Sequence, residues 1–265
     1  MLKLLVAVER SLEASFALRT ACFLGEQIHI RPIYVFDPPG RDISLGAGWA
    51  WKSWEREIRQ QAKSVIDVLL LAERSQCANI EEPVVLRGDP VQEMASYFWK
   101  GGFDLLVAGA PFREWGLLAL SRRFWQTAKK AHRELPLMVV RHLKSIQRVV
   151  GLTDGGRPAE SALGMLVRLN PFLSPEITLV GLPRGSGPVA ETEALNLERG
   201  LAILKEKGID AEGRKASEMP SGGLTELLRA SDLVVSPFLK DDYHTHLHGV
   251  SEHDVPAALF FIGPD

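Results

Sequence analysis

The sequence contains few cysteines: Cys22 and Cys77 are the only two among 265 residues. Two cysteines so far apart in sequence do not suggest a disulfide framework or a zinc ribbon. A chain with so little cysteine fits a reducing compartment, so we expect a cytoplasmic protein. We expect Cys22 to pack inside a helix as a small apolar side chain.

An excess of charge of one sign is also absent, as are long hydrophobic runs. The formal net charge is −2, which argues against a general affinity for nucleic acid or for an anionic membrane. The apolar run at residues 4–8 is too short for a signal peptide or a membrane span. We therefore expect neither nucleic-acid nor membrane partners.

Sequence motifs of common enzymes are missing too. We find no P-loop, no Gly-x-Ser-x-Gly elbow and no His-Glu-x-x-His pattern. The turns after the first predicted strand of each half read "ERSLE" and "DGGRP", without the His-x-Gly-His signature of nucleotidyltransferases. We expect a protein without catalytic activity.

Short apolar runs alternate with helical patterns along the first half. Such runs, bounded by polar residues, predict strands buried on both faces of a parallel sheet. Ser11 is a candidate N-cap, and Pro90 suits the first turn of a helix. The expected strands are 3–9, 28–36, 83–88, 103–110 and 136–141, and the expected helices are 11–25, 49–74, one from Pro90, and 117–133.

The second half repeats this order. Residues 219–238 parallel residues 89–110, with Asp232 aligned to Asp104. A repeat of such length indicates a duplicated domain. We expect two α/β domains, 1–143 and 144–265, each a doubly wound five-stranded parallel sheet, packed together as a pseudo-dimer. Ligands of such sheets bind at the carboxyl ends of the strands. The expected strands of the second half are 148–156, 177–182, 210–217, one ending near 238, and 255–263.

Several segments resemble one protein family. The first half carries "LLVAVERSLEASFALRTACFLG", "VLRGDPVQEM" and "FDLLVAGAPFREWGLLALSRRFWQTAKKAHRELPLMVVR", and the second carries "VVGLTDGGRPAESALGMLVRL" and "TELLRASDLVVSP". Over essentially its whole length the chain resembles a tandem universal stress protein of the UspA-like family. The resemblance implies two Rossmann-like domains of the adenine nucleotide alpha hydrolase-like type. It also implies a cytoplasmic, non-catalytic stress-response protein whose ligand regulates the choice of a protein partner.

In nucleotide-binding members of that family, an Asp after the first strand contacts the adenosine part. A Gly-x2-Gly-x9-Gly-Ser/Thr motif after the fourth strand wraps the phosphates. This chain has Glu9 at the acid and Gly109 at the first glycine, but Phe112, Arg122 and Arg123 at the other three positions. The resemblance therefore implies a degenerate ATP site that binds weakly or not at all. The two arginines either bind phosphate through their guanidinium groups or are solvated residues at a helix start.

The second copy keeps the acid and lacks the phosphate motif. Asp154 follows its first strand, with Gly155 and Gly156 beside it. These glycines either present uncovered backbone amides to a nucleotide or form an ordinary turn. Residues 237–256 replace the longer connection 109–136 of the first copy, so we expect the fourth helix to be short or absent.

A histidine-rich segment lies in this shortened connection. His244, His246 and His248 alternate, so in an extended chain they point the same way. Three imidazoles on one side are typical of a zinc site. The alternative is an exposed polar loop that is rich in histidine.

Tryptophans at helical spacing form a further motif. Trp51, Trp54 and Ile58 share one helical face. They either cover the sheet or form a patch for a partner or an apolar ligand. A zinc or apolar-ligand carrier and a slow nucleotide hydrolase are therefore the alternative functions. The sequence offers no metal site or base for the hydrolase at a strand end.

Overall fold

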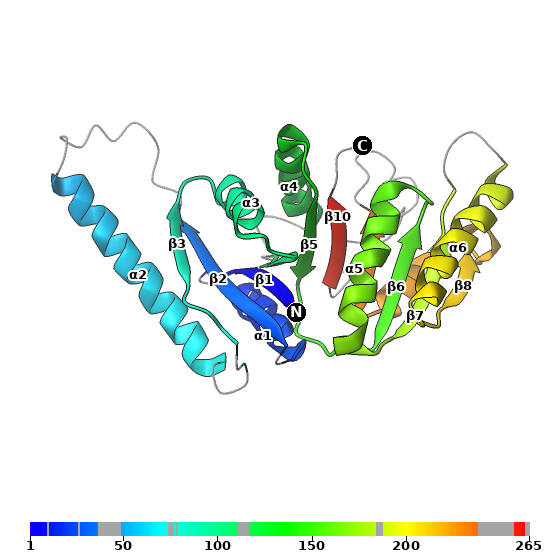
Figure 1. Cartoon of the computed structure of the whole chain (residues 1–265), viewed down its shortest axis with the longest axis horizontal. Coiled ribbons are helices and arrows are strands. Elements are labelled where there is room, and N and C mark those ends of the chain that lie inside the picture. Colours follow the sequence, from blue (N-terminus) through cyan, green and yellow to red (C-terminus); the bar gives the residue numbers. More distant parts are fainter. Residues whose placement is uncertain are drawn as a thin grey trace. The chain divides into compact units, whose positions relative to one another are not determined.

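The computed structural model describes residues 1–9, 11–25, 27–36, 49–73, 77, 79–110, 117–183, 188–237 and 257–262. The chain divides into two compact units, Met1–Gly109 and Ala110–Asp265. Strands alternate with helices in both units (Figure 1). The expected boundary between residues 143 and 144 follows the sequence repeat rather than this division, and it stays a prediction.

The first unit contains a parallel sheet with the strand order β3-β2-β1-β4. Leu4, Leu5 and Val6 are consecutive residues of β1, and all three are fully buried. Since successive side chains of a strand point to opposite faces, both faces of this sheet are covered. The elements of this unit are β1 (Leu2–Ala7), α1 (Leu12–Phe23), β2 (Ile28–Phe36), α2 (Trp49–Glu73), β3 (Val84–Arg87), α3 (Pro90–Gly101) and β4 (Leu105–Gly109).

The second unit has the strand order β5-β10-β9-β6-β7-β8. Its run β8-β7-β6-β9 repeats the order β3-β2-β1-β4 of the first unit, so the duplication is visible in the topology. The expected fold class, mostly parallel α/β sheets in tandem, is confirmed. The elements are α4 (Leu117–Ala131), β5 (Leu135–Val140), β6 (Arg148–Thr153), α5 (Arg157–Leu173), β7 (Glu176–Gly181), α6 (Val189–Glu206), β8 (Glu212–Lys215), a 3-10 turn (Ala216–Glu218), α7 (Gly223–Ala230), β9 (Leu233–Pro237) and β10 (Ala257–Ile262).

Strands β5 and β10 pair antiparallel. The pairs β1–β2, β1–β4, β2–β3, β6–β7, β6–β9, β7–β8 and β9–β10 are parallel. Val140 lies opposite Ala257, and Leu135 lies opposite Ile262. In the sequence repeat, these are the last strands of the first and second copies. The two copies therefore meet through their last strands inside the second unit.

An aspartate fixes the start of the first strand in each copy. The backbone N–H of Asp104 donates to the Lys3 carbonyl, and the Asp104 carboxylate accepts from the Lys3 N–H, both at 2.8 Å. Asp232 makes the same two bonds with Arg148, again at 2.8 Å. The predicted alignment of Asp232 with Asp104 is confirmed by this shared geometry.

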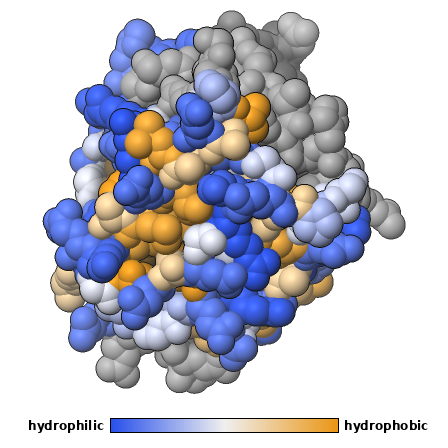
Figure 2. Space-filling view, turned by 90° about the vertical axis from the view of Figure 1, so that its right-hand side faces the viewer, coloured by the Kyte–Doolittle hydropathy of each residue, from blue (hydrophilic) through white to orange (hydrophobic). Residues whose placement is uncertain are grey.

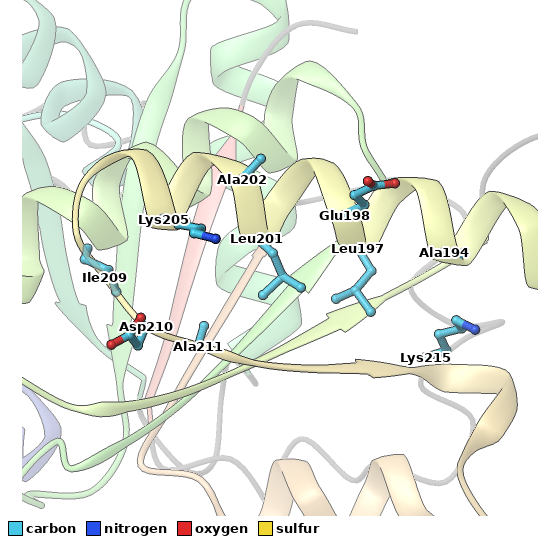
Figure 3. A pocket seen from close by; sticks show the side chains of 10 residues that line it. All are labelled: Ala194, Leu197, Glu198, Leu201, Ala202, Lys205, Ile209, Asp210, Ala211 and Lys215. Atoms are coloured by element: carbon cyan, nitrogen blue, oxygen red, sulfur yellow. The ribbon is translucent and has the colours of Figure 1, made fainter.

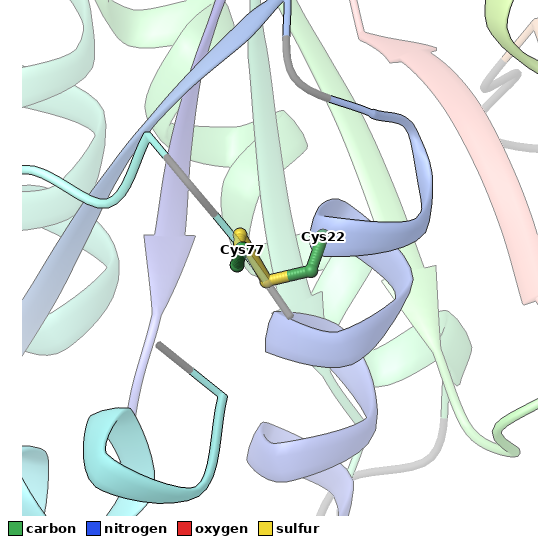
Figure 4. The surroundings of a disulfide bond; sticks show 2 residues. All are labelled: Cys22 and Cys77. Carbon is green, nitrogen blue, oxygen red and sulfur yellow. A yellow bond between two sulfur atoms is a disulfide. The ribbon is translucent and has the colours of Figure 1, made fainter. Parts of the chain in front are cut away.

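The cysteine prediction was wrong. Cys22, near the end of α1, and Cys77, in the segment before β3, form a disulfide with their Cα atoms 5.2 Å apart (Figure 4). That distance lies within the usual range for disulfides. The 55-residue separation in sequence hid the pair, because folding brings the segment before β3 against α1.

The long helix predicted over residues 49–74 is confirmed as α2. Ile58 is half-buried on it, but the side chains of Trp51 and Trp54 lie outside the described part, so the role of the tryptophan motif stays a prediction. Of the helices that the structure describes, α2 included, none combines the length and the apolar character needed to cross a lipid bilayer.

Candidate nucleotide site

In the first unit, the acid after β1 is tied to the start of α1. The Ser11 hydroxyl donates to Glu9 Oε1 and accepts from the Ala14 N–H, each at 3.1 Å. Ser11 is therefore the N-cap of α1, as predicted. Glu9 is exposed and lies at the positive end of the helix dipole. Its carboxylate can accept hydrogen bonds from a ligand's hydroxyl or amino groups.

Gly109 ends β4 and lies directly against the same helix start. An ideal Cβ on Gly109 would be 2.3 Å from the Glu13 carbonyl carbon and 2.6 Å from the Ala14 nitrogen. Backbone atoms cannot yield as a flexible side chain can. The glycine is therefore required by the close packing of α1 on β4, and this packing accounts for it without a phosphate.

Substituting Gly109 with alanine is expected to lower the free energy of unfolding by about 1–3 kcal/mol, because the methyl group overpacks the α1 backbone. Urea denaturation measures this loss. Gly164→Ala is the matched control, since an added Cβ there meets nothing within 4 Å on helix α5. The control should hold its stability or gain up to about 1 kcal/mol. Equal behaviour of the two variants would contradict the close approach.

The predicted phosphate loop is only partly within the described residues. Phe112 belongs to residues 111–116, which the structure does not describe. Arg122 is exposed and Arg123 half-buried in the second turn of α4, one turn beyond the helix start that the sequence suggested. Neighbouring residues of a helix project about 100° apart, so the two guanidinium groups leave the helix in different directions. Their phosphate binding stays a prediction.

In the second unit, Asp154 follows β6 and is almost completely buried, with 3% of its surface exposed. Its Oδ1 accepts the Gly156 N–H at 3.0 Å. Gly156 is the N-cap of α5, so the carboxylate lies at the positive end of a 17-residue helix. The turn is thus built around the acid, as in an Asx turn.

Of the two alternatives for these glycines, the contacts favour the ordinary turn over uncovered amides. The Gly155 N–H donates to Thr153 Oγ1 at 3.3 Å, and the Gly156 N–H is taken by Asp154. Gly155 has a φ of +70°, and an ideal Cβ on it would lie 2.2 Å from Asn196 Oδ1. The glycine is therefore needed for its backbone conformation and for the approach of Asn196.

Two polar residues are buried on α6, and the sequence did not identify them. Asn196 Nδ2 donates to the Leu182 carbonyl at 2.9 Å. Glu193 is 1% exposed, and its Oε2 accepts from the Ser217 backbone N–H at 3.2 Å and from the Ser217 hydroxyl. The signal was available, because both residues interrupt the apolar face of α6 at a spacing of three.

Asp154 and Asn196, which meet at Gly155, form the second-unit cluster. A carboxylate accepts hydrogen bonds from the amino group or the sugar hydroxyls of a nucleoside. The cluster therefore suits the nucleoside part of a nucleotide.

The predicted zinc ligands His244, His246 and His248 lie within residues 238–256, outside the described part, as does the expected loss of the fourth helix. Among the residues that are described, no three His, Cys, Asp or Glu side chains are grouped to hold a metal ion. The zinc site stays a prediction.

Comparisons with known proteins identify the fold. No family model and no curated protein matches the sequence. A universal stress protein from Archaeoglobus fulgidus is similar in structure with a TM-score of 0.63 at 13% identity, covering 99% of this chain and 97% of that one. A putative universal stress protein from Pseudomonas aeruginosa reaches 0.55 at 14% identity, covering 97% and 92%.

The cytoplasmic domain of a prokaryotic cation chloride cotransporter is also similar, with a TM-score of 0.60 at 11% identity, covering 99% of this chain and 95% of that one. Identities this low establish architecture and not activity. The predicted resemblance is confirmed at that level: the chain has the fold of the tandem universal stress proteins.

Proposed function

We propose that the chain is a non-catalytic stress-response protein of the universal stress protein family that binds adenine nucleotides weakly. Asp154, buried directly after β6, carries this proposal, because in nucleotide-binding members of the resembled family an Asp after the first strand contacts adenosine. The polar cluster around Asp154 supports recognition of the nucleoside. The first copy contributes Arg122 and Arg123 as side-chain ligands for phosphate. Ligand binding regulates the contact with a protein partner.

The two sequence copies act as a pseudo-dimer in this proposal. The antiparallel pairing of β5 with β10 supports it, because it joins the last strands of the two copies. A duplicated chain of this kind carries two ligand positions that have diverged. Only the second has the acid in buried form, so we assign it the main nucleoside affinity.

Calorimetric titration with adenosine and with ATP, each with and without Mg²⁺, tests the proposal. Asp154→Ala is expected to weaken adenosine binding at least about tenfold, which corresponds to about 1.4 kcal/mol. Asp67→Ala, an exposed acid on α2, is the matched control and should leave binding unchanged. Absence of heat with both ligands at millimolar concentration would refute nucleotide binding.

The arginine pair is tested separately. Arg122→Ala/Arg123→Ala is expected to weaken ATP binding to the first copy while leaving adenosine binding unchanged, because only the phosphates engage guanidinium groups. Lys129→Ala/Lys130→Ala removes the same charge from the end of the same helix and serves as the control. Steady release of phosphate from ATP above background would refute the non-catalytic assignment and favour the hydrolase.

A further inference from the structure

The second unit has an apolar groove whose lining includes Ala194 and Leu197, the chain neighbours of Glu193 and Asn196 on α6. It lies between α6 and β8 and has a volume of about 540 Å³. Figure 3 shows Leu197 and Leu201 projecting from α6 toward β8. Figure 2, which shows the right-hand side of the view in Figure 1, has apolar surface surrounded by hydrophilic residues. Lys205 and Ile209 also line the groove.

Strand β8 forms one border of the groove and ends the sheet. In the described part of the chain, β8 pairs with β7 on one side and is last in the strand order. Backbone N–H and C=O groups along the outer side of an edge strand can pair with a further strand. The groove therefore adjoins a backbone edge that can accept a strand.

The side chains of β8 alternate between the groove and the opposite face. An ideal Cβ on Gly213 would lie 2.9 Å from Leu201 Cδ1, so Gly213 faces α6. Lys215 lines the groove on the same face. Glu212 and Arg214 lie on the other face, where Arg214 Nε donates to Glu212 Oε1 at 2.9 Å. The face of β8 that points away from the groove therefore carries one acid, Glu212, and one base, Arg214.

This charge pattern selects one partner and one register. In an antiparallel pair, directly opposed side chains lie on the same face of the sheet. If two copies of β8 pair with both α6 helices on one face, the two-fold axis passes through residue 212, 213 or 214. An axis at Glu212 or Arg214 opposes two like charges. An axis at Gly213 opposes Glu212 to Arg214 of the second copy, and does so twice.

We propose that this face binds a second copy of the chain, with the two β8 strands paired antiparallel about Gly213. The charge complementarity of Glu212 and Arg214 specifies the register, and the same charges disfavour the two neighbouring registers. Gly213 faces the groove without a side chain, so both apolar grooves meet above the dyad and are covered together. The proposal is independent of nucleotide binding.

Sedimentation velocity of the full chain from about 5 µM to about 500 µM tests this, the range being chosen for a small, weak interface. A concentration-dependent dimer is expected. Arg214→Glu places Glu212 opposite a new acid, and Glu212→Arg places Arg214 opposite a new base. Each single variant is expected to weaken dimerisation about tenfold or more. Arg168→Glu on α5 makes the same charge change elsewhere and should leave the dimer unchanged.

Two further arms separate an interface effect from misfolding. The double variant Glu212→Arg/Arg214→Glu restores opposite charges and should dimerise like the original chain. Mixing the two single variants should give a heterodimer, because one strand then carries two bases and the other two acids. A chain that stays monomeric throughout the range overturns the proposal, and so does a dimer that is indifferent to both charge reversals.

Discussion

Reduction of the Cys22–Cys77 disulfide is expected to lower the free energy of unfolding of the first unit by about 4 kcal/mol. The bridge closes a loop with a sequence separation of 55 residues. In the chain-entropy description, opening a loop of that length returns about 4 kcal/mol of conformational freedom to the unfolded chain. That is a large share of the stability of an ordinary domain.

The folded state supports an effect of this size. The bridge ties the end of α1 to the segment before β3, so β2 and α2 lie inside the closed loop. Cys22 is 7% exposed, so its sulfur also belongs to the buried core. We expect the reduced protein to keep this packing and to lose only the cross-link.

Urea denaturation with and without a phosphine reductant measures this loss of stability in the unfolding transition of the first unit. Cys22→Ser/Cys77→Ser should match the reduced protein and should not respond to reductant. Mass spectrometry after thiol alkylation should find no modified cysteine until the protein is reduced. Identical denaturation midpoints in both redox states, together with alkylation of the untreated chain, would show that the two thiols are not bridged.

The disulfide is a feature of the fold that the sequence did not predict. Apolar runs and helical periodicity predicted the alternating elements, because local patterns determine which segments form strands and helices. The repeat predicted the matching topology and the equivalence of Asp104 and Asp232. The pairing of Cys22 with Cys77 depends on which segments fold against each other, and no local pattern contains that information.

The candidate site was predictable in part for the same reason. Asp154 was identified from its place after an apolar run, and the structure places it at that strand end. Its surroundings were not identified, because no local pattern shows that Asn196 of α6 folds against Gly155. Gly109 was interpreted as part of a phosphate loop, although the backbone of α1 already requires a glycine there.

Substituting Asp232 with asparagine is expected to lower the free energy of unfolding of the second unit by about 2–4 kcal/mol near neutral pH. The carboxylate is 3% exposed and accepts the Gln147 and Arg148 amides at 3.0 and 2.8 Å. It also forms an ion pair with Lys144. An asparagine would lose the charge and direct an amide donor toward existing donors, which leaves buried groups unpaired.

The same contacts predict how this loss depends on pH. Burial alone would raise the pKa of Asp232, but the hydrogen bond from Lys144, the Arg148 and Gln147 amides and the Lys144 charge outweigh it, so the pKa is lowered from its ordinary value of 3.8. A group whose pKa is lower in the folded than in the unfolded chain contributes its full stability above the unfolded value. That contribution disappears as the pH falls through the lower, folded value.

Urea denaturation of both proteins between neutral pH and the acid limit of folding therefore has a specific expected outcome. The difference between the original chain and Asp232→Asn should be constant above about pH 5 and should shrink as the pH falls below about 4. Asp67→Asn, the same change at an exposed position of α2, should stay within about 0.5 kcal/mol at every pH. If the difference in unfolding free energy does not depend on pH, Asp232 contributes through its shape and not its charge. The proposed role of its ion pair and charged hydrogen bonds would then be wrong.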